Sequence, residues 1–562
     1  MPSSTPPGDP VQGVHAYHTL SKHTPHRSAP GPGYMDWESQ PNPFRTFAGA
    51  PQVALPLGGD RLHTPHAALY HSVGQSPPHP LGRESIATFL ELSLGLAAWK
   101  AYLDEWWALR CNPSSGNLHP TEGYLIVPGI AGPPGNTLEA GVYHYLSRDH
   151  LLEQRWAPQT EQQRLWEQGF APGTFLLGLS SIHWREAWKY GLRAYRYCQL
   201  DVGHAAAALR YAAAALGWQA EIVTEAADAD LAHLMALTAT QEPADPEAEH
   251  PDLLLLIRTT PTPVTTAPTV DCSVAALAAQ VADGPWLGQA NRLSPLHRHA
   301  WPEIDQVAQA TWKGHTPAEN GLAAPLPPLE PGHPDLPAAR LIRQRRSAQR
   351  YDGHTHLGKA AFFRILDACL PRPHASPWDL RPGTPRIHLL LMLHRVTDLA
   401  PGLYALPRRE EALPLLQRAL QATFPWERVA EAPAHLPLYR LAQGDLRGVA
   451  QQLSCRQEIA ADGAFSLGML GEFTAALAQQ GAWAYRSLFW EAGMLGQTLY
   501  LEAEAEGIRG TGIGCYFDDT FHQLLGLQGE AWQSLYHFTV GGPLVDNRLQ
   551  SRPAYHHLQG RI

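Results

Sequence analysis

The feature that most constrains this chain is an internal repeat, in which two long segments align without a gap at an offset of 290 residues. Residues 194–218 and 484–508 both begin A-Y-R, and they share further identities such as Gly203 with Gly493. Both segments lack Pro, are rich in Ala and have a Gly near the end, which predicts a long helix in each. Ala-rich helices can resemble one another by composition alone, but the shared opening and the two shared Gly residues favour a duplicated domain.

Other pieces of the chain recur in the same order. G-V-Y-H-Y at 141–145 corresponds to G-L-Y-A-L at 402–406, and each follows an apolar strand. Each copy then ends in another strand, at 253–258 and at 535–540. This order predicts an α+β fold in each copy, with helices around a mostly antiparallel sheet.

Two Pro-rich stretches separate the copies, T-T-P-T-P-V-T-T-A-P-T at 259–269 and A-A-P-L-P-P-L-E-P-G-H-P at 323–334. Such stretches are extended and do not form a core of their own. They bracket an insert of helical character at 270–322, to which the sequence gives no role. The predicted organisation is an N-terminal domain over 1–258, linkers with the insert over 259–334, and a C-terminal domain over 335–562.

The overall composition excludes several classes of protein. The net charge of -10 argues against a nucleic-acid partner. No apolar run reaches membrane-spanning length and the N-terminus lacks a signal peptide, so we expect a soluble cytoplasmic protein without a membrane partner. The 29 His are scattered without metal-ligand spacing, so no metal site is predicted. The 6 Cys include no C-x-x-C pair, so neither a zinc knuckle nor a disulfide framework is expected.

Four short stretches carry residues suited to a ligand. P-S-S-G-N at 113–117 precedes an apolar strand, although these are also ordinary turn residues. R-R-S-A-Q-R at 345–350 opens the second copy, and K-H-T-P-H-R at 22–27 is its weaker counterpart. Guanidinium groups bind phosphate in a bidentate manner, so the first of these basic stretches suits an anion, with a solvated helix start as the alternative. T-G-I-G-C at 511–515 offers bare backbone N–H groups, and Arg548 follows the last strand.

Taken together, P-S-S-x-N, R-R-S-x-x-R, the G-x-G turn after an Ala-rich helix and the late Arg resemble the FMN-dependent nitroreductase fold. The stretch W-R-E-A-W-K-Y at 184–190 makes the chain most similar to the SagB-type dehydrogenases, which oxidise azolines in thiazole and oxazole peptide biosynthesis. The resemblance covers nearly all of both copies and leaves out the insert and the Pro-rich stretches.

The resemblance implies FMN as the cofactor and assigns roles to individual residues. The residues implied for the FMN phosphate are Arg345, Arg346, Ser347, Arg350 and Arg548. The residues implied for the flavin ring or ribityl chain, from the other copy, are Pro113, Ser114, Ser115 and Asn117. The Gly turn that includes Gly512 is implied to bind the cofactor, with the backbone N–H groups of Gly514 and Cys515 near flavin N5. The Cys515 side chain is expected to act as packing rather than as a reactive thiol.

Each copy lacks one part of this set. The second copy reads L-P-R-P-H-A-S-P-W-D at 370–379 where the first has P-S-S-G-N, and the first reads A-E-I-V-T where the second has its Gly turn. We therefore predict an intramolecular pseudo-dimer with one complete FMN site built by both halves and one degenerate site.

Lys189 and Tyr190 match the catalytic Lys-Tyr pair of the azoline oxidases, and a Lys beside a Tyr can take the proton that azoline oxidation releases. The plain alternative is a surface lysine. Ser114 is discounted as a hydrolytic nucleophile because no G-x-S-x-G elbow surrounds it. His204 is discounted as a catalytic base because it is expected to be an ordinary helix residue with local hydrogen-bond partners. The expected substrate is a peptide heterocycle or a small conjugated molecule. A nitro- or quinone-reductase using NAD(P)H, and a non-catalytic peptide- or protein-binding module, remain the other two readings.

Overall fold

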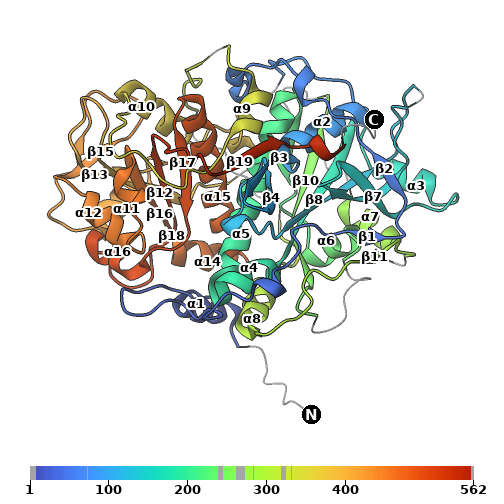
Figure 1. The fold of residues 1–562 in the computed structure, drawn as a ribbon, viewed down its shortest axis with the longest axis horizontal. Helices are drawn as coiled ribbons and strands as arrows, with labels where there is room; N and C mark the ends of the chain where they lie inside the picture. The colour runs from blue at the N-terminus through green and yellow to red at the C-terminus, as the bar shows by residue number, and fades with distance from the viewer. Residues whose placement is uncertain are drawn as a thin grey trace.

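The computed structural model describes residues 8–72, 74–133, 135–237, 245–260, 273–282, 284–317, 325–330, 332–333, 335–381 and 383–558. Cys272 and most of the Pro-rich stretch at 259–269 lie outside these residues. Two seven-stranded antiparallel sheets dominate the molecule, one in each half of the chain, and they flank a pair of long central helices (Figure 1). We call the part up to Arg258 the first half and the part from residue 335 the second half.

Six strands follow the same order in both sheets, and the remaining edge strand differs. In the first half the order across the sheet is β2 (Gln52–Ala54), β7 (Leu151–Trp156), β6 (Gly141–Leu146), β5 (Thr121–Val127), β8 (Thr174–Ile182), β10 (Glu249–Arg258) and β9 (Gln219–Ile222). In the second half it is β14 (Glu427–Arg428), β15 (Tyr439–Gln443), β13 (Gly402–Leu406), β12 (Ile387–Leu393), β16 (Phe465–Gly471), β18 (Gln533–Gly541) and β17 (Arg509–Ile513). The edge strands differ because β2 precedes the other strands of its sheet along the chain, whereas β14 lies between β13 and β15. The predicted α+β fold with antiparallel sheets is confirmed.

The recurring G-x-Y motifs form the same hairpin in each half. Val127 pairs with Gly141 where β5 meets β6, and Leu393 pairs with Gly402 where β12 meets β13. The strands of both hairpins are buried on both faces, which explains why their sequences are continuously apolar rather than alternating.

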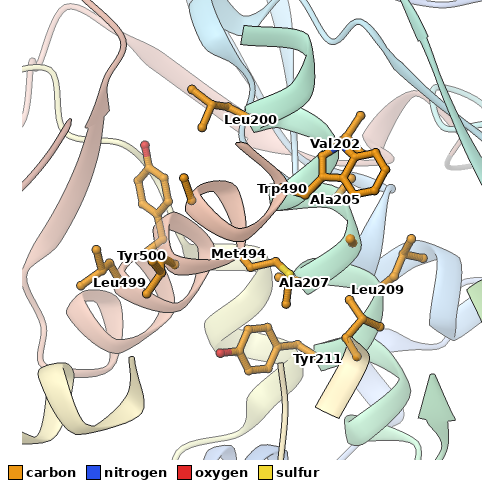
Figure 2. Close-up of a cluster of buried hydrophobic side chains, with 14 of the residues drawn as sticks. Leu200, Val202, Ala205, Ala207, Leu209, Tyr211, Trp490, Met494, Leu499 and Tyr500 are labelled. Carbon is orange, nitrogen blue, oxygen red and sulfur yellow. The ribbon is translucent and has the colours of Figure 1, made fainter. Parts of the chain in front are cut away.

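The helices α5 (Ala194–Ala215) and α15 (Ala484–Ala505) are the two repeated segments, and they pack against each other at the centre of the molecule. Figure 2 shows their buried side chains, including Leu209 and Met494, in one shared core. At the crossing, a Cβ on Gly203 would lie 2.3 Å from the Trp490 carbonyl oxygen, and a Cβ on Gly493 would lie 2.2 Å from that of Leu200. Glycine is therefore shared at this aligned position, Gly203 with Gly493, because the two helix backbones touch there.

The Arg of each A-Y-R motif ties its helix to the opposite half. Arg196 on α5 binds Asp518 at the start of α16 (Asp518–Leu525), with 2.7 Å between Nη1 and Oδ1. Arg486 on α15 binds Asp228 at the start of α6 (Asp228–Leu234), with 2.8 Å between Nη2 and Oδ2. All four side chains are buried, so the two pairs are equivalent contacts of a pseudo-two-fold interface.

The insert belongs to the first half. Its helix α7 (Val274–Val281) packs against α6, and Leu277 joins a core cluster with Leu254 and Leu256 of β10. Its strand β11 (Gln289–Ala290) pairs with β1 (Phe47–Ala48), and its helix α8 (Pro302–Ala310) packs on α1 (Pro10–Leu20). Helix α7 of the insert therefore covers part of one face of the first sheet, while α8 and β11 pack on other elements of the first half.

The C-terminal segment crosses to the first half. Strand β19 (Gln550–Pro553) pairs with β3 (Leu96–Tyr102), which forms a hairpin with β4 (Glu105–Arg110) (Figure 1). The remaining α-helices are α2 (Arg83–Ser93), α3 (Gln163–Gln168), α4 (His183–Tyr190), α9 (Ala338–Gln344), α10 (Lys359–Ala368), α11 (Ala412–Ala419), α12 (Arg447–Leu453), α13 (Ile459–Asp462) and α14 (Phe473–Gln480).

Candidate active site

A cavity of about 560 Å³ lies where the two halves meet. From the first half it is lined by the β3–β4 hairpin, the loop 112–117 and side chains of α4 and α5. From the second half it is lined by residues 345–347, α15, β17 and the turn that follows β17, and β18. Of the residues predicted for a cofactor site, those on its wall are Pro113, Ser114, Ser115, Asn117, Tyr190, Arg345, Arg346, Ser347, Gly512, Gly514 and Cys515.

The P-S-S-G-N loop is a tight, left-handed turn. Gly116 and Asn117 both have positive φ, +58° and +60°, which Gly and Asn adopt more readily than other residues. The Asn117 side-chain amide donates to the Ala108 carbonyl at 2.8 Å, and the Ser114 hydroxyl accepts the His119 N–H at 2.8 Å. A Cβ on Gly116 would lie 2.6 Å from the Tyr190 hydroxyl oxygen, so the glycine also makes room for Tyr190.

Two buried carboxyl groups lie directly beneath this loop. Asp201 of α5 accepts the Ser115 N–H at 3.2 Å, and Glu186 of α4 accepts from the Ser114 hydroxyl at 3.5 Å. Burial raises the pKa of Asp201 to about 7, and burial together with Asp201 raises the pKa of Glu186 well above its ordinary value. The pair therefore keeps a proton under conditions where isolated carboxyl groups have lost theirs.

Basic side chains gather at another part of the wall. Arg345 is buried, donates to the Cys111 and Arg110 carbonyls and stacks on the Tyr500 ring at 4.9 Å. Its Nη1 is buried without a hydrogen-bond partner among the described residues. Burial, with the neighbouring Arg345, lowers the pKa of Arg346 to about 10.

Two basic residues join this group that sequence reasoning did not single out. Burial, with Arg346 and Arg509 nearby, lowers the pKa of Lys100, and both Lys100 and Arg509 line the cavity. Cations that disfavour one another's charge in this way would be stabilised by an anion. Ser347 stands among them and shares a hydrogen bond of 2.8 Å with the Tyr500 hydroxyl.

The predicted Gly turn is the end of β17 and the bend after it. A Cβ on Gly512 would lie 1.8 Å from the Tyr536 hydroxyl oxygen, and one on Gly514 would lie 2.3 Å from the Tyr197 ring. The Gly512 N–H donates to the Tyr500 hydroxyl at 3.0 Å. Glycine is therefore required here because tyrosine rings lie directly against the backbone.

Cys515 corrects the sequence-based expectation about the cysteines. It forms a disulfide with Cys455, and the two Cα atoms are 5.8 Å apart although 60 residues separate them in the sequence. Motif spacing detects only cysteines that are close along the chain, whereas the fold brings this pair together. Cys515 is therefore a cross-linked residue of the cavity wall and not simply a small packing side chain.

Three predicted site residues lie off the cavity wall. Arg350 is exposed, and Arg548 has a side chain that is 72% exposed and pairs with Asp546 at 2.7 Å. Lys189 lies beside the wall, with its Nζ 5.3 Å from the centre of the Tyr190 ring. The weaker basic stretch 22–27 is bound elsewhere, since Lys22 pairs with Asp519 of α16 at 2.6 Å.

Some of the site residues that sequence reasoning missed carry a signal in the sequence, and others carry none. Asp201 stands opposite Glu491 in the repeat, which marks an acidic position kept in both copies. Glu186 lies within the W-R-E-A-W-K-Y stretch without any feature of its own. Lys100, Arg509 and Tyr197 carry no local signal, because only the fold brings them to the cavity.

Neither a metal cluster nor a membrane-spanning helix is found in the part of the chain that the structure describes. No three His, Cys, Asp or Glu side chains there are grouped as metal ligands would be, and no helix there is long and apolar enough to cross a bilayer.

The matches found among known proteins are nitroreductases or proteins that resemble them in fold. Residues 342–542 match the model of the Nitroreductase family. A candidate nitroreductase of Methanocaldococcus jannaschii is 29% identical over 134 residues, which are 23% of this chain. The chain spans 65% of the length of this curated relative.

A solved structure resembles the whole chain. The crystal structure of a candidate nitroreductase from Anabaena variabilis matches with a TM-score of 0.65 at 21% identity, over 95% of this chain and 99% of that chain. The likeness to the E. coli microcin synthetase McbBCD complex has a TM-score of 0.27 at 17% identity, over 36% of this chain and 70% of that chain, which is too low to carry an argument. The chain therefore has the nitroreductase fold over nearly its whole length, and its residues 342–542 match the nitroreductase family.

Proposed function

We propose that this protein is an FMN-dependent oxidoreductase with one FMN site to which both halves contribute. The observation that carries the proposal is the cavity of about 560 Å³ at the junction of the halves. Its volume falls within the range of about 300–1,000 Å³ typical of ligand sites. The P-S-S-G-N loop comes from one half and the R-R-S cluster and Gly turn from the other, so neither half alone has the full set.

The basic part of the wall fits the phosphate of FMN. The Arg345 Nη1 is a buried donor without a partner among the described residues, and such a group is costly unless a ligand satisfies it. Burial and the positive charges of Arg345 and Arg509 lower the pKa of Arg346, and burial with Arg346 and Arg509 lowers that of Lys100. This gives the same indication, because a phosphate would offset the repulsion among these cations.

The glycine and tyrosine part of the wall fits a flat ring system. Gly512 and Gly514 line the cavity together with Tyr197 and Tyr536, whose rings lie against these glycines. FMN bound there would supply two-electron redox chemistry, while the protein orients it and sets its electrostatic surroundings.

Lys189 and Tyr190 support a dehydrogenase of the SagB type. The partly buried Tyr190 has a pKa raised well above its ordinary value, first by desolvation and then by Glu186, so it stays protonated and can donate a hydrogen bond into the cavity. Lys189 lies next to it and can accept the proton that a substrate loses. An azoline on a peptide, or a similar small conjugated molecule, is a substrate that needs such a base.

FMN content and one pair of lysine variants test this function. We expect the purified protein to bind about one FMN per chain, because only one place in the fold has all the parts. Lys189→Ala should keep FMN and lower azoline oxidation by about 100-fold or more, the usual contribution of a general base. The matched control is Lys359→Ala, since Lys359 is a partly exposed lysine on α10 with only a 3.9 Å pair to Asp398.

Other results of these assays would change the conclusion. Two FMN per chain would contradict the shared single site. Unchanged azoline oxidation in Lys189→Ala would contradict the role of Lys189. Reduction of nitro compounds or quinones by NAD(P)H without azoline oxidation would make the protein a reductase of that class, and a protein that cannot be loaded with FMN would be a binding module.

A further inference from the structure

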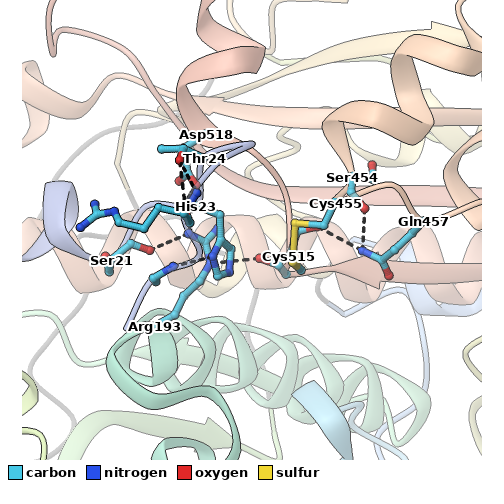
Figure 3. Close-up of a disulfide and its surroundings, with 12 residues drawn as sticks. Ser21, His23, Thr24, Arg193, Ser454, Cys455, Gln457, Cys515 and Asp518 are labelled. Atoms are coloured by element: carbon cyan, nitrogen blue, oxygen red, sulfur yellow. Dashed lines mark hydrogen bonds and ion pairs between the residues drawn. A yellow bond between two sulfur atoms is a disulfide. The ribbon is translucent and has the colours of Figure 1, made fainter. Parts of the chain in front are cut away.

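We infer that the Cys455–Cys515 disulfide is a second redox centre that exchanges electrons with a flavin in the adjacent cavity; this inference rests on the proposed function. Cys515 directly follows the Gly turn and lines the cavity, as does Gln457 on the other side of the disulfide. Figure 3 shows the disulfide with Gln457 beside it, and the Gln457 amide donates to the Cys515 carbonyl at 3.1 Å.

The disulfide is accessible and its loop is strained. Both cysteines are partly exposed. Cys455 and Arg456 are consecutive non-glycine residues with positive φ, +52° and +63°. Such backbone strain gathers at functional sites, and disulfides that are strained or exposed are the ones that are readily reduced.

The disulfide is not needed to hold its two segments together, because hydrogen bonds already do so. The Phe517 N–H donates to the Leu453 carbonyl at 2.8 Å. Asp518 accepts a hydrogen bond from Arg193 (Figure 3) and another from Arg196. The Arg193 Nε also donates to the Gly514 carbonyl at 3.1 Å. The S–S bond can therefore open and close without releasing the segment that forms the cavity wall.

The other described cysteines cannot take this role. Cys111, Cys198 and Cys369 are fully buried and unpaired. Burial raises the pKa of the Cys111 and Cys369 thiols to about 12, so neither forms the thiolate that reacts in disulfide exchange. Among the described residues, redox chemistry of sulfur at the cavity belongs to the Cys455–Cys515 pair.

The reaction balances with a reduced flavin as the electron donor. The S–S bond breaks, and each sulfur gains one electron and one proton to become a thiol. The dihydroflavin gives up the same two electrons and two protons and becomes oxidised flavin. In the reverse direction, the dithiol reduces the flavin and the disulfide forms again.

An anaerobic reductive titration of the FMN-loaded protein with dithionite tests the inference. Flavin and disulfide each accept two electrons, so we expect uptake of about four electrons per chain, against about two in Cys455→Ser. Cys369→Ser is the matched control and should keep about four, because Cys369 is a buried thiol that donates only to the Ile365 carbonyl.

Alkylation gives a readout that is independent of turnover and of the variants. N-ethylmaleimide added to wild-type protein under native conditions should label Cys455 and Cys515 only after flavin reduction, as peptide masses will show. Flavin-loaded protein that takes up about two electrons and leaves both cysteines unlabelled would overturn this inference alone. Protein that binds no flavin would overturn the proposed function and this inference with it.

Discussion

The pseudo-two-fold axis relates two sites at which equivalent elements of the two halves meet. One of these sites is the cavity, and the other, which we call the second place, is closed by direct packing. At the cavity, the short helix η4 (Ser115–Asn117) and strand β17 stand on opposite walls. At the second place, the equivalent short helix η6 (Trp378–Leu380) packs directly against β9, the counterpart of β17. The same arrangement of backbone thus yields a cavity in one place and a contact in the other.

A buried ion pair accounts for much of the difference between the open cavity and the closed second place. Arg210 stands on α5 where α15 has Tyr500, and it forms two hydrogen bonds with the Asp379 carboxylate, at 2.8 and 2.7 Å. Both side chains are almost completely buried. A bidentate ion pair therefore fills the second place, whereas Tyr500 leaves room beside Arg345 in the first.

The equivalent acidic residues Glu491 and Asp201 also differ in their surroundings, since of the two only Glu491 is paired with an arginine among the described residues. Glu491 pairs with the buried Arg408 and accepts the Arg386 N–H at 3.0 Å. Asp201, its counterpart, faces Glu186 and receives only hydrogen bonds from the loop. One acid is therefore part of a closed ion-pair network, while the other lies in an environment that holds a proton next to a cavity.

Breaking the ion pair that fills the second place is expected to have the largest effect, and the effect is on the free energy of unfolding. Asp379→Ala would leave the buried Arg210 without its carboxylate and should lower the free energy of unfolding by about 3–5 kcal/mol. Urea unfolding would measure this, with FMN content per chain unchanged. Replacing both partners, Arg210→Met with Asp379→Leu, is the control and should be much closer to neutral. Loss of FMN in the native Asp379→Ala protein would mean that the second place is part of the cofactor site.

Closing the cavity should affect the cofactor rather than the fold. Gly512→Ala adds a methyl group that would lie 1.8 Å from the Tyr536 hydroxyl oxygen. Overpacking of about 1–3 kcal/mol would weaken FMN binding by roughly 10- to 100-fold, measurable by flavin fluorescence quenching. The matched control is Gly448→Ala on α12, where the added Cβ meets nothing within 4 Å. Equal FMN affinity in both variants would mean that the cofactor does not bind against β17.

The Asp201 environment predicts a particular pH dependence of stability. Its pKa is raised from 3.8 to about 7 by burial, so between these values the folded protein binds more protons than the unfolded chain. Stability from this group therefore falls as pH rises from about 4 to about 7 and is constant outside that window.

Asp201→Asn should remove this slope while keeping an acceptor for the Ser115 N–H. Because Asp201 shares its proton with Glu186, whose charge Lys189 favours, we expect a difference of only about 1–2 kcal/mol between the pH 5 and pH 8 stabilities of the two proteins. Urea unfolding at both pH values measures it. Identical slopes in wild type and Asp201→Asn would show that Asp201 ionises normally.

Sequence reasoning predicted the features that are determined by residues close together along the chain. The helices α5 and α15, the apolar strands before Gly141 and Gly402 and the P-S-S-G-N turn all depend on neighbouring residues, and the structure confirms these elements. The carboxyl pair depends on how two consecutive α-helices pack, and the disulfide joins residues 60 positions apart, so no sequence motif predicted either of them. The crossing of the C-terminal segment to β3 was equally invisible, because β19 is exposed along its length and has no apolar pattern.

That crossing separates Arg548 from the other basic residues, and it leads to the smallest expected effect. Arg548 lies between β18 and β19, forms its ion pair with Asp546 in solvent and stacks on the Tyr102 ring at 5.6 Å. Arg548→Ala should change FMN affinity by no more than about threefold, since exposed pairs contribute little. Arg345→Met, which removes the buried guanidinium at the cavity, should weaken FMN by about tenfold or more. A larger loss in Arg548→Ala than in Arg345→Met would mean that the segment after β18 folds over the phosphate when FMN binds.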